Sequence, residues 1–451
     1  MSKTDTAVSA GTSGNALGGL LERHFHLKEH GTTARTEILA GVTTFLTMAY
    51  IIFVNPAILK DTGMDQNAVF VATCLAAAFG SAMMGIVANY PLALAPGMGL
   101  NAYFTYSVVL GSNGAVTWQT ALGAVFISGV IFLILSVLPV REWIINAIPK
   151  SLKMAIGAGI GLFLGIIALQ AAGIVVDNPA TLVTLGSLHA PTTVLAILGF
   201  FVMVALDRLR VPGAIIIAIL ATTVVGILMG ISEFNGIFSA PPSLMPTFFA
   251  MDLAGALNIG LIAIVFTFLF VDLFDNTGTL IGVAHRAGLI GPDGRIPRLG
   301  RALISDSSAA MVGAALGTST TTSYIESAAG VKAGGRTGMT AVVVALLFLA
   351  ALFLAPLAST IPGYATAPAL LYVACLMTRG LTEIDWEDAT EFVPAVVTAL
   401  AMPLTYSIAH GIAFGFVSYA AIKVLSGRFR DLNAALAILA ILFVIKFAWI
   451  V

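Results

Sequence analysis

Apolar runs long enough to cross a lipid bilayer recur along almost the whole chain. A helix needs about 20 mostly apolar residues to span the hydrocarbon core. The run at 392–422 is long enough for two crossings, with Pro403 and Gly411 as candidate breaks. We expect thirteen to fifteen crossings, and fourteen fits best. The runs lie near 38–59, 68–88, 92–110, 119–140, 154–172, 191–206, 212–230, 257–283, 302–316, 338–356, 365–378, 392–422 and 432–451.

Composition supports the same fold class. Hydrophobic residues make up 59% of the chain and charged residues 10%, against about 25% charged residues in a soluble domain. The chain is therefore expected to be an all-α polytopic membrane protein in contact with lipid. The net charge of −1 gives no reason to expect a nucleic-acid partner.

Basic residues fall in alternate loops, which predicts the orientation of the chain. Loops rich in Lys and Arg face the cytoplasm, and the intervening loops offer Lys60 alone. We therefore expect a multi-pass protein of the cytoplasmic membrane, with a cytoplasmic N-terminal segment (1–36) and an extracytoplasmic linker (231–256). The basic clusters comprise Arg141, Lys150 and Lys153; Arg208 and Arg210; Arg286, Arg295, Arg298 and Arg301; and Lys332 and Arg336.

Two stretches suggest an internal repeat. "TFLTMAYIIF" (44–53) and "TFLFVDLFDN" (267–276) both open with Thr-Phe-Leu. The same offset places the Gly-rich "PGMGLNAYF" on the Thr-rich "STTTSYIES" (319–327). Interruptions in register in two halves are typical of transporters built from repeats. An odd number of spans in each half, 37–230 and 257–451, would give the repeats opposite orientations.

Four acidic residues lie within apolar segments of the second half: Asp272, Asp275, Asp306 and Glu326. Ionised carboxylates in hydrocarbon are costly and usually functional. Asp272, Asp275, Asn276 and Thr279 share one helical face, which must look into a cavity or onto another helix. No Lys or Arg lies in the same apolar runs, so we do not expect a fixed anion site. A purely structural network of carboxylates and hydroxyls is the alternative.

The segment "GTSTTTSYIESAAG" (317–330) places hydroxyls beside Glu326. Consecutive Thr and Ser lower helix propensity, so an unwound backbone could aim N–H groups at a ligand. A carboxylate there suits a heteroaromatic ligand with N–H donors, a proton, or both. Asp272 and Asp275 are one helical turn apart and should not both ionise easily. We expect one of them to hold the coupling proton.

Two motifs raise the possibility of other protein classes, namely a water channel and a membrane enzyme. "VNPAIL" (54–59) and "DNPATL" (177–182) contain the Asn-Pro-Ala triplet of water channels, but Asn-Pro is also a common turn dipeptide. "HFHLKEH" (24–30) holds three histidines with no Cys or carboxylate cluster to complete a metal site. We therefore expect neither a channel, nor an enzyme, nor a metal or organic cofactor.

Four motifs resemble the adenine/guanine/hypoxanthine permease branch of the nucleobase–cation symporters: "TEILAGVTTFLTMAYIIFVNPAIL", "APGMGLNAYFTY", "VDLFDNTGTLIGVA" and "GTSTTTSYIESAAGVKAGGRTG". The resemblance implies fourteen spans in two inverted seven-helix repeats, divided into core and gate domains. It also implies short strand-like breaks in the third and tenth segments, and proton-coupled uptake of a purine nucleobase. A homodimer is left open.

The resemblance also assigns residues. The acid three positions before Gly278 falls on Asp275, and the acid two positions after Tyr324 falls on Glu326. Asp in place of Glu at 275 and Ser327 in place of Asn depart from the uracil and xanthine branches. A carrier of xanthine, uracil or a small anion remains the alternative. The expected substrate-binding residues are Asp275, Glu326, Tyr324, Ile325, Asn101, Ala102, Asn276 and Ser323, and the proton-coupling residues are Asp272, Asp275, Asp306 and Glu326.

Overall fold

The computed structural model describes residues 21–137, 148–258, 262–289 and 296–449 and is mostly helical. Seven of the described helical segments are apolar and long enough to cross a membrane, among them Ala34–Thr62, Gln66–Ala88 and Gly338–Thr360. This confirms a helical membrane protein with many crossings.

Helices of the first half begin at ordinary capping signals. The Thr33 side chain accepts a hydrogen bond from Thr36 N, and Asp65 accepts one from Ala68 N. The elements are α2 (Ala34–Met48), α3 (Ile51–Leu59), α4 (Gln66–Met83), β1 (Leu94–Pro96), α5 (Met98–Ala102), α6 (Trp118–Val137), α8 (Lys150–Ala171), β2 (Val175–Asn178), β3 (Leu182–Leu185), α9 (Pro191–Arg208) and α10 (Ala214–Leu228). A π-helical stretch, Tyr103–Val109, continues α5.

The second half repeats much of this order. Thr337 caps α15 and Asp388 caps α18 through their side chains. The elements are α11 (Leu253–Ala256), α12 (Ile262–Arg286), α13 (Leu299–Leu316), β4 (Thr321–Ser323), α14 (Ser327–Lys332), α15 (Gly338–Ala351), α16 (Ala355–Thr360), α17 (Gly363–Thr378), α18 (Ala389–Leu404), α19 (Ile408–Leu425) and α20 (Ala434–Trp449).

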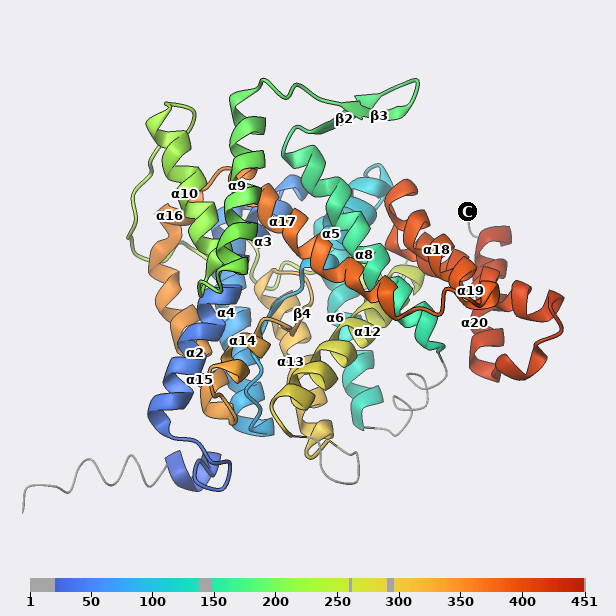
Figure 1. The fold of residues 1–451 in the computed structure, drawn as a ribbon, viewed down its shortest axis with the longest axis horizontal. Helices are drawn as coiled ribbons and strands as arrows, with labels where there is room; N and C mark the ends of the chain where they lie inside the picture. The colour runs from blue at the N-terminus through green and yellow to red at the C-terminus, as the bar shows by residue number, and fades with distance from the viewer. Residues whose placement is uncertain (1–20, 138–147, 259–261, 290–295, 450–451) are drawn as a thin grey trace, which may run out of the picture.

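The helices pack as two bundles, each drawn from both halves of the sequence. In the first bundle, α2, α4 and α6 pack on α13 and α15, and α12 packs on α6. In the second bundle, α8 packs on α17 and α18, while α9 packs on α10 and α17. Figure 1 shows the blue helices α2 and α4 beside the orange helix α15. The boundary between the two bundles therefore does not coincide with the boundary between the two halves of the sequence.

The two interrupted segments meet as a two-stranded ladder in the interior. β1 pairs antiparallel with β4, with Leu94 opposite Ser323 and Pro96 opposite Thr321. All six residues are buried. Figure 1 shows β4 near the centre of the molecule. The β-branched threonines favour an extended backbone, and the ladder satisfies backbone groups that could not face lipid. The predicted strand-like breaks are thus present in both segments.

Two features differ from simple expectation. The loop between α8 and α9 contains an antiparallel hairpin, β2–β3, which the sequence pattern did not predict. The long apolar run at 392–422 is broken at 405–407, directly after Pro403, and not at Gly411, which lies inside α19. Pro403 is tolerated in the last turn of α18, and Tyr406 adopts a left-handed backbone conformation with φ 52°.

Candidate functional site

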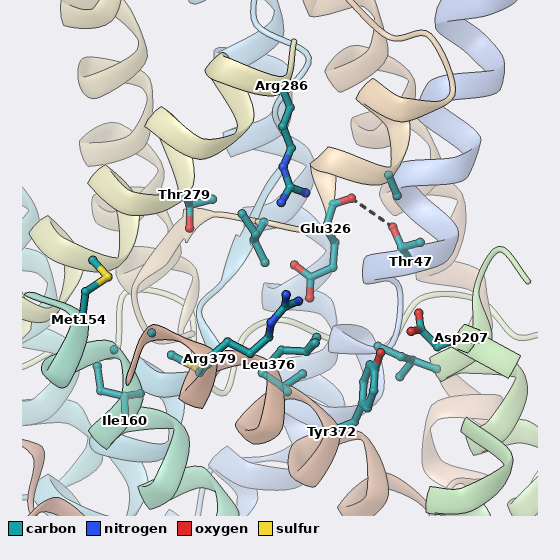
Figure 2. Close-up of a pocket in the computed structure, with 18 of the residues that line it drawn as sticks. Thr47, Met154, Ile160, Asp207, Thr279, Arg286, Glu326, Tyr372, Leu376 and Arg379 are labelled. Carbon is teal, nitrogen blue, oxygen red and sulfur yellow. Dashed lines mark hydrogen bonds between the residues drawn. The ribbon is translucent and has the colours of Figure 1, made fainter. Parts of the chain in front are cut away.

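A cavity of about 640 Å³ lies between the two bundles. The first bundle contributes Thr47 of α2, Thr279 of α12, and Ile325 and Glu326 before α14. The second bundle contributes residues of α8, α9, α10 and α17, including Ile160 and Tyr372. Figure 2 shows these side chains around one open space. A ligand here would touch both bundles at once.

Glu326 is the carboxylate that reaches this cavity from the interrupted segment. It lies in the turn between β4 and α14, so its position follows from the strand pairing. The Tyr50 hydroxyl, which is buried, donates a hydrogen bond to Glu326 Oε1 at 2.5 Å. Thr47 Oγ1 donates to the Glu326 carbonyl at 3.5 Å (Figure 2). Glu326 also lines the cavity, so a bound ligand could donate a hydrogen bond to its carboxylate.

The hydroxyl-rich segment around β4 is buried behind the cavity wall. Ser323 Oγ donates to Asp306 Oδ1 at 3.2 Å, which joins the strand to α13. The Tyr324 hydroxyl donates to the Pro96 carbonyl at 2.6 Å. Ser319 Oγ donates to Asn101 Oδ1. Ser323, Tyr324, Asp306, Asn101 and Ala102 are all buried and do not line the cavity, whereas Glu326 and Ile325 do.

The polar face of α12 runs from a buried interior toward the cavity. Asp272 is 1% exposed and Asn276 is 0% exposed, whereas Thr279 lines the cavity. Neither polar atom of the Asn276 side chain has a hydrogen-bond partner among the described residues. Asp275 lies in α12 between them, and its side chain is outside the described part of the structure.

Charged side chains that the sequence pattern did not single out also line the cavity. They are Lys153 at the start of α8, Asp207 near the end of α9, Arg286 at the end of α12, and Arg379 just after α17. The expectation of no fixed anion site assumed that no Lys or Arg is present at the site, and that assumption was wrong. It counted only residues inside the apolar runs, whereas these cations reach the cavity from helix ends. All four lie on the side of the basic loops.

At the other end of the boundary, neutral groups join the two bundles. Ser107 Oγ, from the π-helical stretch of the first bundle, donates to the Tyr406 carbonyl of the second bundle at 2.9 Å. The Tyr406 hydroxyl donates to Gln170 Oε1, and its ring packs edge-on against Phe163 with centroids 5.4 Å apart. A separate cavity of about 540 Å³ adjoins these residues. The charged lining residues of the Glu326 cavity lie at the opposite end of the boundary from this second cavity, near the basic loops.

Comparisons with known proteins place this geometry in context. A model of the Permease family matches residues 35–414. The adenine permease AdeP of Escherichia coli K12 is 52% identical over 96% of this chain and 97% of its own length. The guanine/hypoxanthine permease PbuO of Bacillus subtilis is 46% identical over 94% of this chain and 99% of its own length.

Solved structures with much lower identity share the fold. The transmembrane domain of the cyanobacterial bicarbonate transporter BicA superposes with a TM-score of 0.62 at 16% identity, covering 84% of this chain and 97% of that one. The murine anion transporter Slc26a9, in an inward-facing state, also gives 0.62 at 12% identity, covering 94% of this chain and 74% of that one.

Proposed function

Because the chain belongs to the Permease family, a family of transporters and not of enzymes, we propose that it takes up purine nucleobases, namely adenine, guanine or hypoxanthine. Relatives that align over nearly the full chain carry adenine and guanine/hypoxanthine permease names. The observation that carries the proposal is Glu326, a carboxylate set in the cavity between the two bundles and already hydrogen-bonded to Tyr50.

The purine is proposed to bind with an N–H edge on Glu326. A carboxylate only accepts hydrogen bonds, and purine bases present N–H donors. Ile325 and Thr279 lie on the same wall and would cover the ring. Asn101, Ala102, Ser323 and Tyr324 would position this wall through the β1–β4 ladder, and Asn276 and Asp275 would complete it from α12. Contacts to both bundles would couple occupancy to movement between them.

Uptake is proposed to be driven by a proton. The groups proposed to carry it are Asp272, Asp275, Asp306 and Glu326. Asp272 and Asp306 are buried, and intramembrane carboxylates that face a protein interior are typical of proton relays. A proton would neutralise the empty site before the first bundle crosses the apolar barrier. No metal or organic cofactor is part of this proposal.

The proposed architecture has fourteen membrane segments in two inverted repeats (37–230 and 257–451), joined by the 231–256 linker. The first bundle would be the moving core and the second the gate. With the basic loops and the 1–36 segment in the cytoplasm, the Glu326 cavity would open inward, as in the inward-facing Slc26a9 structure that shares the fold. Residence in the cytoplasmic membrane is part of the same proposal.

Uptake into cells that lack their own nucleobase permeases tests the function. Labelled adenine, guanine, hypoxanthine, xanthine and uracil are supplied in turn. Uptake of at least one of the first three, with counterflow of unlabelled base, is expected, because a carrier exchanges internal for external substrate and a channel does not. Preference for uracil or xanthine, or uptake without counterflow, would contradict the proposal.

Cysteine labelling tests the orientation. Thr184 in the β2–β3 hairpin and Lys332 at the end of α14 are both exposed. In a variant whose free cysteines, Cys74 and Cys375, are replaced, Thr184→Cys should react with a membrane-impermeant thiol reagent in intact cells. Lys332→Cys should react only in inverted vesicles. The reverse pattern would overturn the orientation.

A further inference from the structure

The cavity carries more positive charge than a neutral base can use. Lys153, Arg286 and Arg379 line it together with two acids, Asp207 and Glu326. Among the described residues, none of these three cations forms a salt bridge, whereas neighbouring Lys150, outside the cavity, pairs with Glu383 at 3.0 Å. Asp207 lies beside Tyr372 (Figure 2). The rim is therefore net positive.

Two of these cations point into the same cavity as Glu326. Figure 2 shows the Arg286 side chain descending from α12 and the Arg379 side chain rising from the end of α17, both directed into the region of the Glu326 carboxylate. One belongs to each bundle. A group bound between the two guanidinium groups would sit at the entrance of the base site.

The size of the cavity points in the same direction. Its volume of about 640 Å³ falls in the range of pockets that bury drug-sized ligands, which are larger than a bare purine. A bare purine would therefore leave unfilled part of the cavity that both arginines also line. Guanidinium groups bind phosphate through paired, charge-assisted hydrogen bonds, and a positive cleft with apolar walls concentrates anions.

We propose that this cavity also binds purine nucleoside monophosphates from the side of the basic loops, with the base on Glu326 and the phosphate on Arg286 and Arg379. The inference rests on the purine function proposed above. The nucleotide acts as a competitive inhibitor and not as a substrate, because carrying a phosphate dianion through the apolar barrier is too costly. Reactions that join the imported base to ribose phosphate produce such a nucleotide. The nucleotide made from the imported base would therefore inhibit further uptake of that base.

Inverted membrane vesicles expose this face to added ligand. Transport of labelled adenine and guanine is measured against increasing AMP or GMP, with adenosine or guanosine as the matched ligand that lacks phosphate. The nucleotide of the transported base should inhibit about tenfold or more better than its nucleoside. This advantage should shrink as salt is raised, because the cations are exposed to screening. Equal potency of nucleotide and nucleoside would overturn the proposal.

Three variants locate the phosphate site. In Arg286→Gln and Arg379→Gln, the ratio of nucleotide to nucleoside potency should fall toward one, and using this ratio cancels any change in base affinity. Lys150→Gln removes a nearby cation outside the cavity and should leave the ratio unchanged. An equal fall in Lys150→Gln would mean that general surface charge, and not this site, attracts the nucleotide. Absence of base transport in the wild type would instead refute the proposed function.

Discussion

The two halves of the chain have a similar order of elements, but matched positions carry different side chains. Where the second half places Asp272, Asp275 and Asn276, the matched stretch of the first half has Ala49, Ile52 and Phe53. The ladder repeats the contrast, because β1 is Leu-Ala-Pro and β4 is Thr-Thr-Ser. In these matched stretches, the first half carries apolar packing residues, and the second half carries the carboxylates and hydroxyls.

This difference shows how a repeated architecture can hold one asymmetric site. A copy that carries no carboxylate is free to pack tightly against its partner. A Cβ on Gly97 would lie 2.8 Å from Thr322 Cγ2, and one on Gly99 would lie 2.5 Å from Ile160 Cγ2. Only glycine permits such approach. The matched segments of the first half therefore contribute Tyr50 and Thr47 to the site, whereas Lys153, Ile160 and Asp207 reach the cavity from α8 and α9.

The sharpest test of the contrast is at position 275. Asp275→Asn should abolish uphill accumulation of purine, because the group proposed to hold the proton is lost. Its partner variant, Asp272→Asn, should keep accumulation and alter its dependence on external pH. The measurement is the steady-state ratio of internal to external label, with and without a protonophore. Continued accumulation by Asp275→Asn would leave both carboxylates with a structural role only.

The next largest effect is expected at Glu326. Glu326→Gln replaces an acceptor with a group that also presents an unwanted pair of donors. Loss of a buried charge-assisted hydrogen bond costs a few kcal/mol, or about a hundredfold in substrate affinity. Competition binding measures the change. Glu383→Gln, a carboxylate outside the cavity, is the control, and unchanged affinity in Glu326→Gln would remove this residue from the site.

A smaller loss of substrate affinity is expected when the hydrogen bond from Tyr50, a residue of the first half, is removed. Tyr50→Phe deletes the hydroxyl that holds Glu326 Oε1 at 2.5 Å. One hydrogen bond to a charged group contributes about 1.5–3 kcal/mol, so affinity should weaken by about tenfold or somewhat more. Tyr106→Phe at the opposite end of the boundary, where the hydroxyl contacts Asp61, is the matched control. Equal losses in both variants would indicate general destabilisation.

The smallest effect tests the packing role of β1. Gly97→Ala should cost about 1–3 kcal/mol through overpacking against Thr322, with little change in substrate affinity. The readout is the apparent melting temperature in detergent, which should fall by a few degrees. Gly300→Ala, where an added Cβ meets nothing within 4 Å, should not lower it. A large loss of affinity in Gly97→Ala would mean that β1 contacts the ligand directly.

The sequence could predict what depends on local pattern. Apolar length predicts the spans, and the Gly- and Thr-rich stretches predict interruptions. The family resemblance implies that these breaks are strand-like, and the structure places the strands at Leu94–Pro96 and Thr321–Ser323. The pairing register depends on groups more than two hundred residues apart, which no local pattern encodes. The same limit explains the missed cations. Arg286 and Arg379 look like ordinary basic loop residues until the helices that end at them converge on one cavity.

The β1–β4 ladder also governs how the chain can be made. The Tyr324 hydroxyl and the Pro96 carbonyl that it contacts are 228 residues apart along the chain. At about 5–20 residues per second, a ribosome needs on the order of ten to fifty seconds to supply the second strand. During that interval β1 has open backbone groups at membrane depth, which lipid cannot satisfy. Until β4 is inserted, the backbone groups of β1 must therefore be hydrogen-bonded by water or by other protein groups.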